Sequence, residues 1–110
     1  FESFDKRKFM NVLTVVARLR AAKGKGDALA ALLVEQAGAV RAAEPGCLAY
    51  RVHRSTVDPE LFLFYEMYAD DAAFDAHRDA AHLAAYRQRR ESQGLTDGTA
   101  QVELFRSCTE

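Results

Sequence analysis

Hydrophobic and polar residues alternate along four segments of the chain, which span residues 11–20, 46–55, 60–69 and 98–107. A period of two residues is typical of a β-strand, because successive side chains point to opposite faces of a sheet. An Asp-Pro pair with turn chemistry lies between the second and third segments. We therefore predict four strands, of which the second and third pair antiparallel.

A helical spacing follows the first strand. Apolar residues recur there at steps of three and four, which predicts an amphipathic helix. Its buried stripe should consist of Leu29, Leu32, Leu33, Gln36, Ala37 and Val40. Asp27 is a plausible N-cap for this helix. The run Glu44-Pro45-Gly46 ends it, since proline disfavours a helical conformation at the residue before it.

Two shorter helices are expected between the third and fourth strands. The Asp70-Asp71 pair should cap the first of them, at 72–78, and Asp79 the second, which runs from 80 to about 93. The resulting order is β-α-β-β-α(α)-β. This is the order of a ferredoxin-like α+β fold, in which helices cover one face of an antiparallel sheet.

The third predicted strand is apolar on both faces. One face carries Leu61, Leu63, Tyr65 and Met67, and the other carries Phe62, Phe64, Glu66 and Tyr68. A strand of this kind should be covered on both sides. The helices of one chain cover only one face of the sheet, so the other face is expected to need a partner.

Composition narrows the class of protein. The chain has 110 residues, of which 49% are hydrophobic and 28% charged, which suits a globular domain. Its net charge of −1 comes from well-mixed charges without a basic stripe, which argues against nucleic-acid binding. No apolar run approaches the ~20 residues of a membrane span. We assign residues 10–110 to one domain and treat 1–9, which lack a clear period, as an N-terminal extension or a cloning remnant.

The two cysteines and the only glycine-rich stretch give little sign of a cofactor. Cys47 and Cys108 form no CxxC motif and no metal-ligand cluster, so we interpret both as reduced packing residues of a cytoplasmic protein. Gly24-Lys25-Gly26 matches neither the GxGxxG nor the Walker pattern, which disfavours a phosphate-binding loop.

Three short motifs carry a resemblance to a known family. A strand ends in Glu66-Met67-Tyr68, an acidic turn and Ala73-x-x-x-His77 follow, and His82 then precedes an aromatic residue. Together with the Pro-Gly-x-x-x-Tyr sequence at 45–50, this order resembles the antibiotic biosynthesis monooxygenase (ABM) domain. The likeness covers residues 10–107 and is strongest to the quinol-monooxygenase branch.

The resemblance implies a dimer, in which the sheets of two subunits pack into an α/β barrel. It also implies the usual ferredoxin-like strand order, which places the second and fourth strands at opposite edges. Three strand spacings of ~4.8 Å would then keep Cys47 and Cys108 beyond disulfide reach.

The activity that the resemblance implies is oxidation of a quinol or polyphenol by O₂ without metal or flavin. Such a protein must move a proton, hold the aromatic ring in a dry pocket and stabilise its anion. We therefore expect a cofactor-independent monooxygenase. Two alternatives keep the fold: a small-metabolite isomerase or non-catalytic ligand-binding domain, which uses the same cleft for a phosphorylated or carboxylated metabolite, and an assembly protein with no pocket.

His77 is the first candidate for the catalytic base, because histidine titrates near neutrality. It lies three residues after Phe74 and should face the sheet; the alternative is a structural, hydrogen-bonded histidine. His82 and Tyr86 share a helix face and are candidates for a second base and a substrate-binding hydroxyl, or else form a polar pair at the helix edge.

Glu66 is a third catalytic candidate, because a carboxylate among aromatic residues on a central strand is either paired or has a raised pKa. Its pairing partner could be one of the arginines 18, 51 and 54. The candidate pocket walls are aromatic side chains that could equally belong to the core or an interface: Tyr50, Phe62, Phe64 and Tyr68. Asn11 and His53 are weaker candidates, Asn11 because it starts a strand near the expected pocket mouth.

Two departures bear on the chemistry. His77 and His82 are five residues apart, which on a continuous helix separates them by ~140° and disfavours a shared metal. The chain has no tryptophan, and Ala17 and its neighbours within the first strand offer no asparagine, so it lacks residues that the haem-degrading relatives use. We therefore expect neither a metal nor haem degradation.

Overall fold

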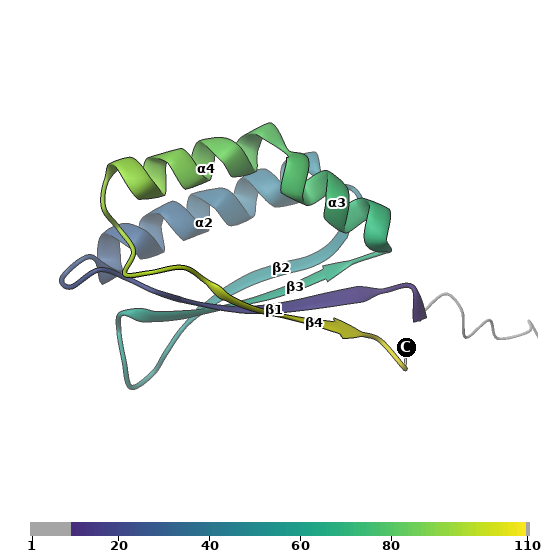
Figure 1. The fold of residues 1–110 in the computed structure, drawn as a ribbon, viewed down its shortest axis with the longest axis horizontal. Helices are drawn as coiled ribbons and strands as arrows, with labels where there is room; N and C mark the ends of the chain where they lie inside the picture. The colour runs from purple at the N-terminus through teal and green to yellow at the C-terminus, as the bar shows by residue number, and fades with distance from the viewer. Residues whose placement is uncertain (1–9, 110) are drawn as a thin grey trace, which may run out of the picture.

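The computed structural model describes residues 10–109. The predicted extension at 1–9 lies outside the described residues. The elements, in chain order, are β1 (Leu13–Arg20), α2 (Gly26–Ala43), β2 (Cys47–Arg54), β3 (Leu61–Tyr68), α3 (Asp71–Asp79), α4 (Ala81–Ser92) and β4 (Gln101–Arg106) (Figure 1).

The strands form one antiparallel sheet in the order β2-β3-β1-β4, and the helices lie on one face of it (Figure 1). This arrangement confirms the predicted ferredoxin-like α+β fold. The second and fourth strands are the two edges, as expected. Both cysteines are free, and burial raises the pKa of the Cys47 thiol to about 11, so this thiol is protonated at neutral pH.

Two periodic patterns of hydrophobic residues, one helical and one alternating, determine which side chains form the core. The α2 stripe that the spacing predicts is buried in full. Along β1, the buried residues alternate with more exposed ones and face the helices: Leu13, Val15, Ala17 and Leu19. The hydrophobic periods of the sequence therefore fix which side of each element faces the interior.

The two faces of β3 have different surroundings, as expected. Its helix-facing set is buried and consists of Phe62, Phe64, Glu66 and Tyr68. Its other set keeps partial exposure and lies on the side of the sheet that none of the helices among residues 10–109 covers (Figure 1). The described part of the chain thus leaves an apolar sheet face open.

Two of the predicted helix caps are wrong. The first helix begins at Gly26, so Asp27 lies inside its first turn, where its carboxylate accepts a hydrogen bond from Arg54 at 2.9 Å. Asp79 is the last residue of α3, and Ala80 precedes α4 without a side-chain cap. Asp70 does cap α3, accepting from the backbone N–H of Ala73 at 2.8 Å.

The last strand is shorter and more exposed than predicted. Val102 and Leu104 face the helical side, yet each is 55% exposed, because no helix packs directly over this edge. Within residues 10–109, no helix is both long enough and apolar enough to cross a membrane.

Gly46 offers a test of the packing between the start of β2 and α3. A Cβ at this position would lie 2.7 Å from the Ala73 Cβ, which is inside van der Waals contact. We predict that Gly46→Ala lowers the free energy of unfolding by about 1–3 kcal/mol. Because Ala73→Gly removes the clashing atom, Gly46→Ala should cost much less in that background, as measured by urea unfolding.

A matched control is Gly38→Ala, where an added Cβ meets nothing within 4 Å in the middle of α2. This change should be neutral or stabilise the chain by up to about 1 kcal/mol. An equal cost of Gly46→Ala with and without Ala73→Gly would contradict the assigned contact.

Candidate active site

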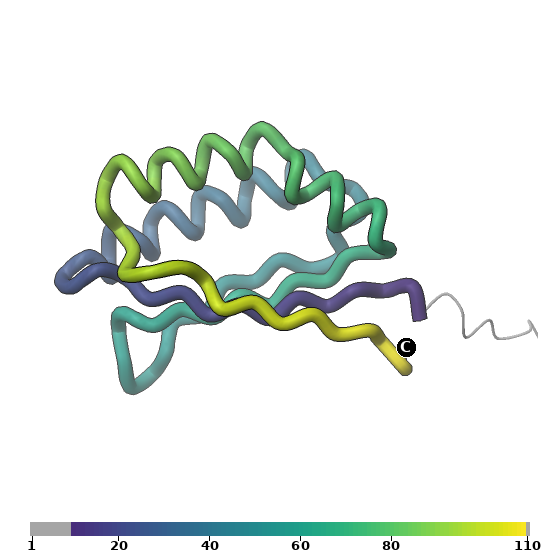
Figure 2. The backbone as a smooth tube through the Cα atoms, viewed as in Figure 1, coloured from purple at the N-terminus to yellow at the C-terminus, as the bar shows by residue number. Residues whose placement is uncertain are grey.

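A cavity of about 320 Å³ lies between the helices α3 and α4 and the sheet. Its floor is the buried face of β1, where Ala17 leaves room that a larger side chain would fill. Ala100, just before β4, is similarly small. The chain therefore forms a pocket of ligand size where α4, which runs beside α2 (Figure 2), faces the β1 and β4 side of the sheet.

His77 projects from α3 into this cavity and is only 5% exposed. Its position three residues after Phe74 turns it towards the sheet, as the helical spacing predicts. Its ring centroid lies 5.8 Å from that of Tyr50 and 5.2 Å from that of Tyr68. The imidazole thus stands among aromatic rings, in a site that largely excludes water.

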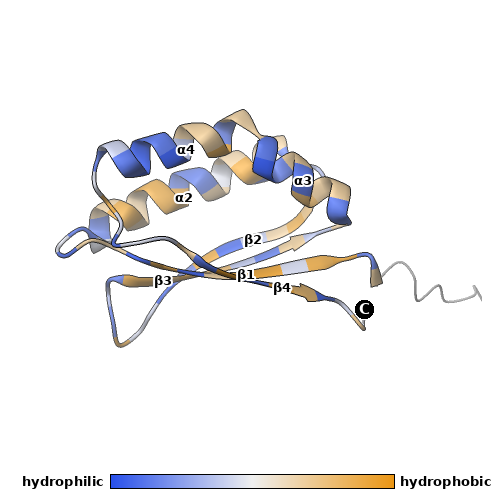
Figure 3. Ribbon diagram, viewed as in Figure 1, coloured by the Kyte–Doolittle hydropathy of each residue, from blue (hydrophilic) through white to orange (hydrophobic). Residues whose placement is uncertain are grey.

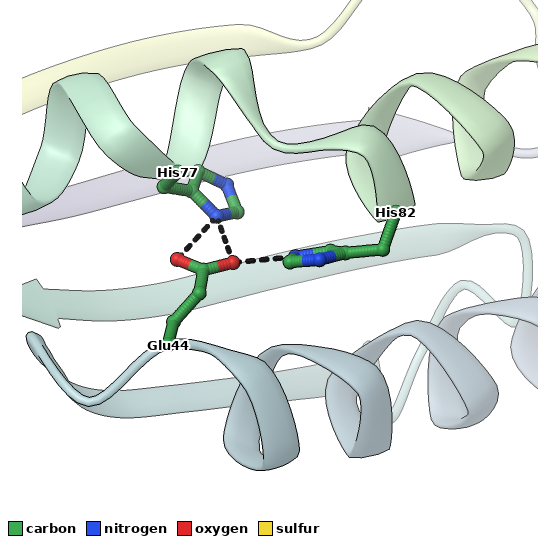
Figure 4. A group of neighbouring side chains, drawn as sticks. All are labelled: Glu44, His77 and His82. Atoms are coloured by element: carbon green, nitrogen blue, oxygen red, sulfur yellow. Dashed lines mark hydrogen bonds and ion pairs between the residues drawn. The ribbon is translucent and has the colours of Figure 1, made fainter.

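The His77 imidazole is hydrogen-bonded to the carboxylate of Glu44. Glu44, the residue that ends α2, has its two oxygens 3.0 and 2.9 Å from Nδ1 of His77 (Figure 4). One of these oxygens is also 2.5 Å from Nε2 of His82. A carboxylate only accepts hydrogen bonds, so each ring nitrogen facing it must carry its proton. Neutral His77 is therefore the Nδ1–H tautomer, and its Nε2 lone pair points away from Glu44.

Glu66 faces that lone pair. Its Oε1 atom is 3.9 Å from Nε2 of His77 and accepts a hydrogen bond from the Tyr68 hydroxyl at 2.5 Å. Burial raises the pKa of the Glu66 carboxyl, against the opposing effects of the Tyr68 hydrogen bond and of His77. The His77 imidazole and a carboxyl group with a raised pKa thus meet at one end of the cavity.

None of the three predicted arginine partners reaches Glu66. Arg18 and Arg51 lie on the uncovered face of the sheet, opposite in strand parity to Glu66. Arg54 instead donates to the Pro59 carbonyl at 2.6 Å and to Asp27. Alternation explains the error for Arg18 and Arg51, because only residues of matching parity share the helix-facing side. Arg54 has matching parity but lies opposite Phe62, four residues along β3 from Glu66.

Two tyrosines complete the polar part of the wall. Tyr50 and Tyr86 both line the cavity, and burial raises the pKa of each phenol. Both hydroxyls therefore stay protonated at neutral pH. Arg90 donates a hydrogen bond to the Tyr86 hydroxyl at 3.1 Å, and Phe64 lies beneath the Tyr50 ring, with centroids 6.2 Å apart.

The remaining candidates lie outside this cavity. His82 lines a separate hollow beside Glu44, and Tyr68 is fully buried behind Glu66. Asn11 lines another hollow, next to Asp71. Phe62 belongs to the hydrophobic core. The exposed His53 lies on the uncovered face of the sheet, opposite in parity to Tyr50.

The spacing argument against a shared metal fails for this chain. It assumes a continuous helix, whereas α3 ends at Asp79 and α4 begins at Ala81, and this break brings both imidazoles to Glu44 (Figure 4). One ligand atom each of Glu44, His77 and His82 lies within 4.8 Å of the others, and these residue types can bind a divalent metal. The separations of 2.5–3.0 Å to the carboxylate are also those of direct hydrogen bonds.

Glu44 is the residue of this candidate site that the sequence pattern does not predict, because the Glu44-Pro45-Gly46 run indicates a helix end. A signal was present: the partial negative charge at a helix C-terminus disfavours a carboxylate there. Glu44 stands at that end of α2 and is stabilised by the two imidazole donors.

The fold and the site together define a small α+β domain with an aromatic pocket that holds a carboxylate-supported histidine. The comparisons specify the family. The sequence matches the antibiotic biosynthesis monooxygenase family over residues 12–89, and the chain belongs to this family. Membership supports a general monooxygenase-like role.

Solved structures agree with this assignment. The chain is similar to PA3566 from Pseudomonas aeruginosa, with 30% identity, a TM-score of 0.79, and 92% of this chain and 98% of that chain covered. Rv0793 from Mycobacterium tuberculosis shares 27% identity at a TM-score of 0.78, covering 90% and 97%. A candidate antibiotic biosynthesis monooxygenase from Caulobacter crescentus shares 25% identity at a TM-score of 0.79, covering 92% and 93%. Among curated proteins, no sequence matches the chain.

The raised pKa of Glu66 predicts a pH-dependent stability difference. Between the ordinary carboxyl pKa and the raised one, the folded state binds a proton that the unfolded state has released. The contribution of Glu66 to stability therefore falls as pH rises from about 4.5 through the raised pKa. Glu66→Gln should lose less stability than wild type over this window, as measured by urea unfolding at a series of pH values.

The matched control is Glu91→Gln, which changes an exposed glutamate near the end of α4. Its stability difference from wild type should stay nearly constant with pH. A Glu66→Gln difference that is equally flat would show that Glu66 titrates normally.

Proposed function

We propose that this protein is a cofactor-independent monooxygenase that oxidises a quinol or a related phenolic compound with O₂. The observation that carries the proposal is the Glu44–His77 pair, which presents an imidazole lone pair to an aromatic cavity. Electron-rich phenolates can transfer an electron to O₂ directly, so proton removal is the main task for the protein. The substrate ring would pack against Tyr50, Phe64 and Phe74.

In the proposed reaction, Nε2 of His77 removes a proton from a substrate hydroxyl. Glu44 stabilises the resulting imidazolium, because its carboxylate already accepts the Nδ1 proton. The substrate anion reduces O₂, and a carbon–oxygen bond then forms to give a hydroperoxide. Loss of water from the hydroperoxide leaves one oxygen atom on the substrate, with all four electrons supplied by the substrate.

Glu66 suits the last step. Its raised pKa favours the protonated carboxyl, which can donate a proton to the departing peroxide oxygen. His77 and Glu66 would then serve as base and acid on adjacent parts of the cavity wall.

The same pair supports a second candidate function. A base and an acid that lie 3.9 Å apart can move a proton between two positions of a substrate, which is the chemistry of an isomerase. This reaction would need no O₂, so oxygen consumption separates the two candidates.

The test is oxygen uptake with a menadiol-type quinol, measured above the rate without protein. We predict that His77→Ala lowers kcat/KM at least about 100-fold, because general-base catalysis contributes this much or more. Glu44→Gln should lower kcat with little change in KM, since the amide still accepts a hydrogen bond but cannot stabilise the imidazolium. The matched control is Gln88→Ala, on the exposed side of α4 and outside the cavity lining, which should retain wild-type uptake.

Uptake that survives His77→Ala would remove this histidine from the proposed reaction. Wild-type protein should also keep its activity after treatment with a chelator and dialysis. A loss that only an added divalent metal restores would replace the cofactor-independent mechanism with one in which Glu44, His77 and His82 bind that metal.

The uncovered face of the sheet leads us to propose a homodimer. This face carries apolar side chains from three neighbouring strands, among them Val16, Leu63, Tyr65 and Phe105. Figure 3 shows hydrophobic residues along these strands, on a sheet whose other face carries the described helices α2, α3 and α4. A second copy packed on this face would remove the apolar surface from water.

The dimer predicts a solution mass near twice the 12.2 kDa of the chain by light scattering. Leu63→Glu should shift the protein towards the monomer, because it places a charge in the buried interface. Val34→Glu, on the exposed side of α2, is the matched control and should leave the mass unchanged. A wild-type monomer at micromolar concentration would refute the dimer.

A further inference from the structure

One end of the cavity carries positive charges that the proposed oxygen chemistry does not use. Three arginines line the cavity as a whole: Arg78, Arg87 and Arg90. Arg78 is engaged by Asp75 and packs over the Phe74 ring. The other two come from the last turns of α4, whose C-terminal half is strongly hydrophilic (Figure 3).

Arg87 and Arg90 lack an acidic partner within residues 10–109, whereas the arginine between them has one. Arg89 forms an ion pair with Glu35 of α2 at 2.7 Å and does not line the cavity. Arg90 is half-buried, and its guanidinium lies 5.2 Å from the Tyr86 ring centroid and hydrogen-bonds the Tyr86 hydroxyl. Two positive charges at the cavity are thus left without a neutralising side chain in this part of the protein.

The Tyr86 hydroxyl adds a hydrogen-bond donor beside these two positive charges. Its hydroxyl oxygen accepts from Arg90, and its own proton has no acceptor among the described residues. Burial raises the pKa of this phenol, so the proton stays in place at neutral pH. Because Tyr86 is nearly fully buried and lines the cavity, its proton is available to a ligand there.

The cationic group and the base lie towards opposite ends of the cavity. Glu66 pairs with Val15, near the start of β1, and α3 lies over that end (Figure 1). The end of α4 lies near the end of β1, where the strand continues into the bridge between Ala21 and Thr96. A strand rises ~3.3 Å per residue, so the floor from Val15 to Leu19 extends over about 13 Å.

We propose that the substrate is an aromatic acid, whose carboxylate binds to Arg87, Arg90 and the Tyr86 hydroxyl while its phenolic hydroxyl meets His77. Guanidinium groups bind carboxylates through charge-assisted, often bidentate hydrogen bonds. The apolar and aromatic walls between the two ends accommodate the ring. This proposal rests on the proposed function only in taking the cavity as the substrate site.

The test compares two probes of nearly equal shape, 4-hydroxybenzoate and 4-hydroxybenzamide, by isothermal titration calorimetry of the full chain without turnover. The carboxylate should bind at least about tenfold more tightly than the neutral amide. Arg90→Gln and Arg87→Gln should each remove most of this preference while leaving the amide affinity nearly unchanged. Arg89→Gln is the matched control, and should retain the preference because its charge is directed to Glu35.

Equal affinity for the two probes, or no binding of either at millimolar concentration, would overturn the proposal. A preference that survives in the Arg87→Gln/Arg90→Gln double variant would do so too. The outcome is separate from oxygen chemistry: if the carboxylate is preferred through these arginines and no phenol supports oxygen uptake, the anion site stands and the monooxygenase assignment fails.

Discussion

Glu44 connects the ends of three helices at a single carboxylate. It ends α2, and its oxygens accept hydrogen bonds from His77 of α3 and His82 of α4. A negative charge at a helix C-terminus opposes the helix dipole, so this arrangement depends on the two imidazole donors. The break between α3 and α4 makes the arrangement possible, because it lets side chains five residues apart point at one oxygen. The orientation of His77, and with it the polarity of the cavity wall, follows from this contact.

The cavity itself follows from how the helices cover the sheet. Helix α4 runs beside α2 (Figure 2), and the cavity separates it from β1 and β4. Small residues on the floor, Ala17 and Ala100, keep the space between α4 and the sheet open. The helices among residues 10–109 all lie on one face of the sheet, so the other face stays apolar and exposed. The placement of these helices thus produces both a ligand-sized pocket and a surface suited to a second copy.

The sequence predicted the repeating features of this structure better than the local contacts. Alternation and helical spacing identified each strand and helix and the buried stripe of α2, because burial on one face imposes a period on the sequence. The strand order came from the family resemblance. Helix starts were less accurate, since Asp27 and Asp79 suit an N-cap but lie inside helices. The partners of Glu66 and the role of Glu44 depend on where separate elements meet, which no short sequence period encodes. The error about His77 and His82 has the same origin, because an angle calculated for one helix does not apply across a break.

The separation between the base and the arginines has a chemical consequence for the proposed reaction. A phenolate reacts with O₂ by giving up an electron, and a cation beside its oxygen would stabilise the anion and make this transfer harder. At the base end, the positive charge that His77 gains with the substrate proton is offset by the negative charge of Glu44, so no strong net positive charge arises beside the phenolate. Arg87 and Arg90 hold a carboxylate at the far end, where their charge fixes the orientation of the substrate with a smaller effect on the reacting ring. The cavity can therefore bind an anion firmly and still leave its phenolate electron-rich, which a single site combining base and arginine could not do.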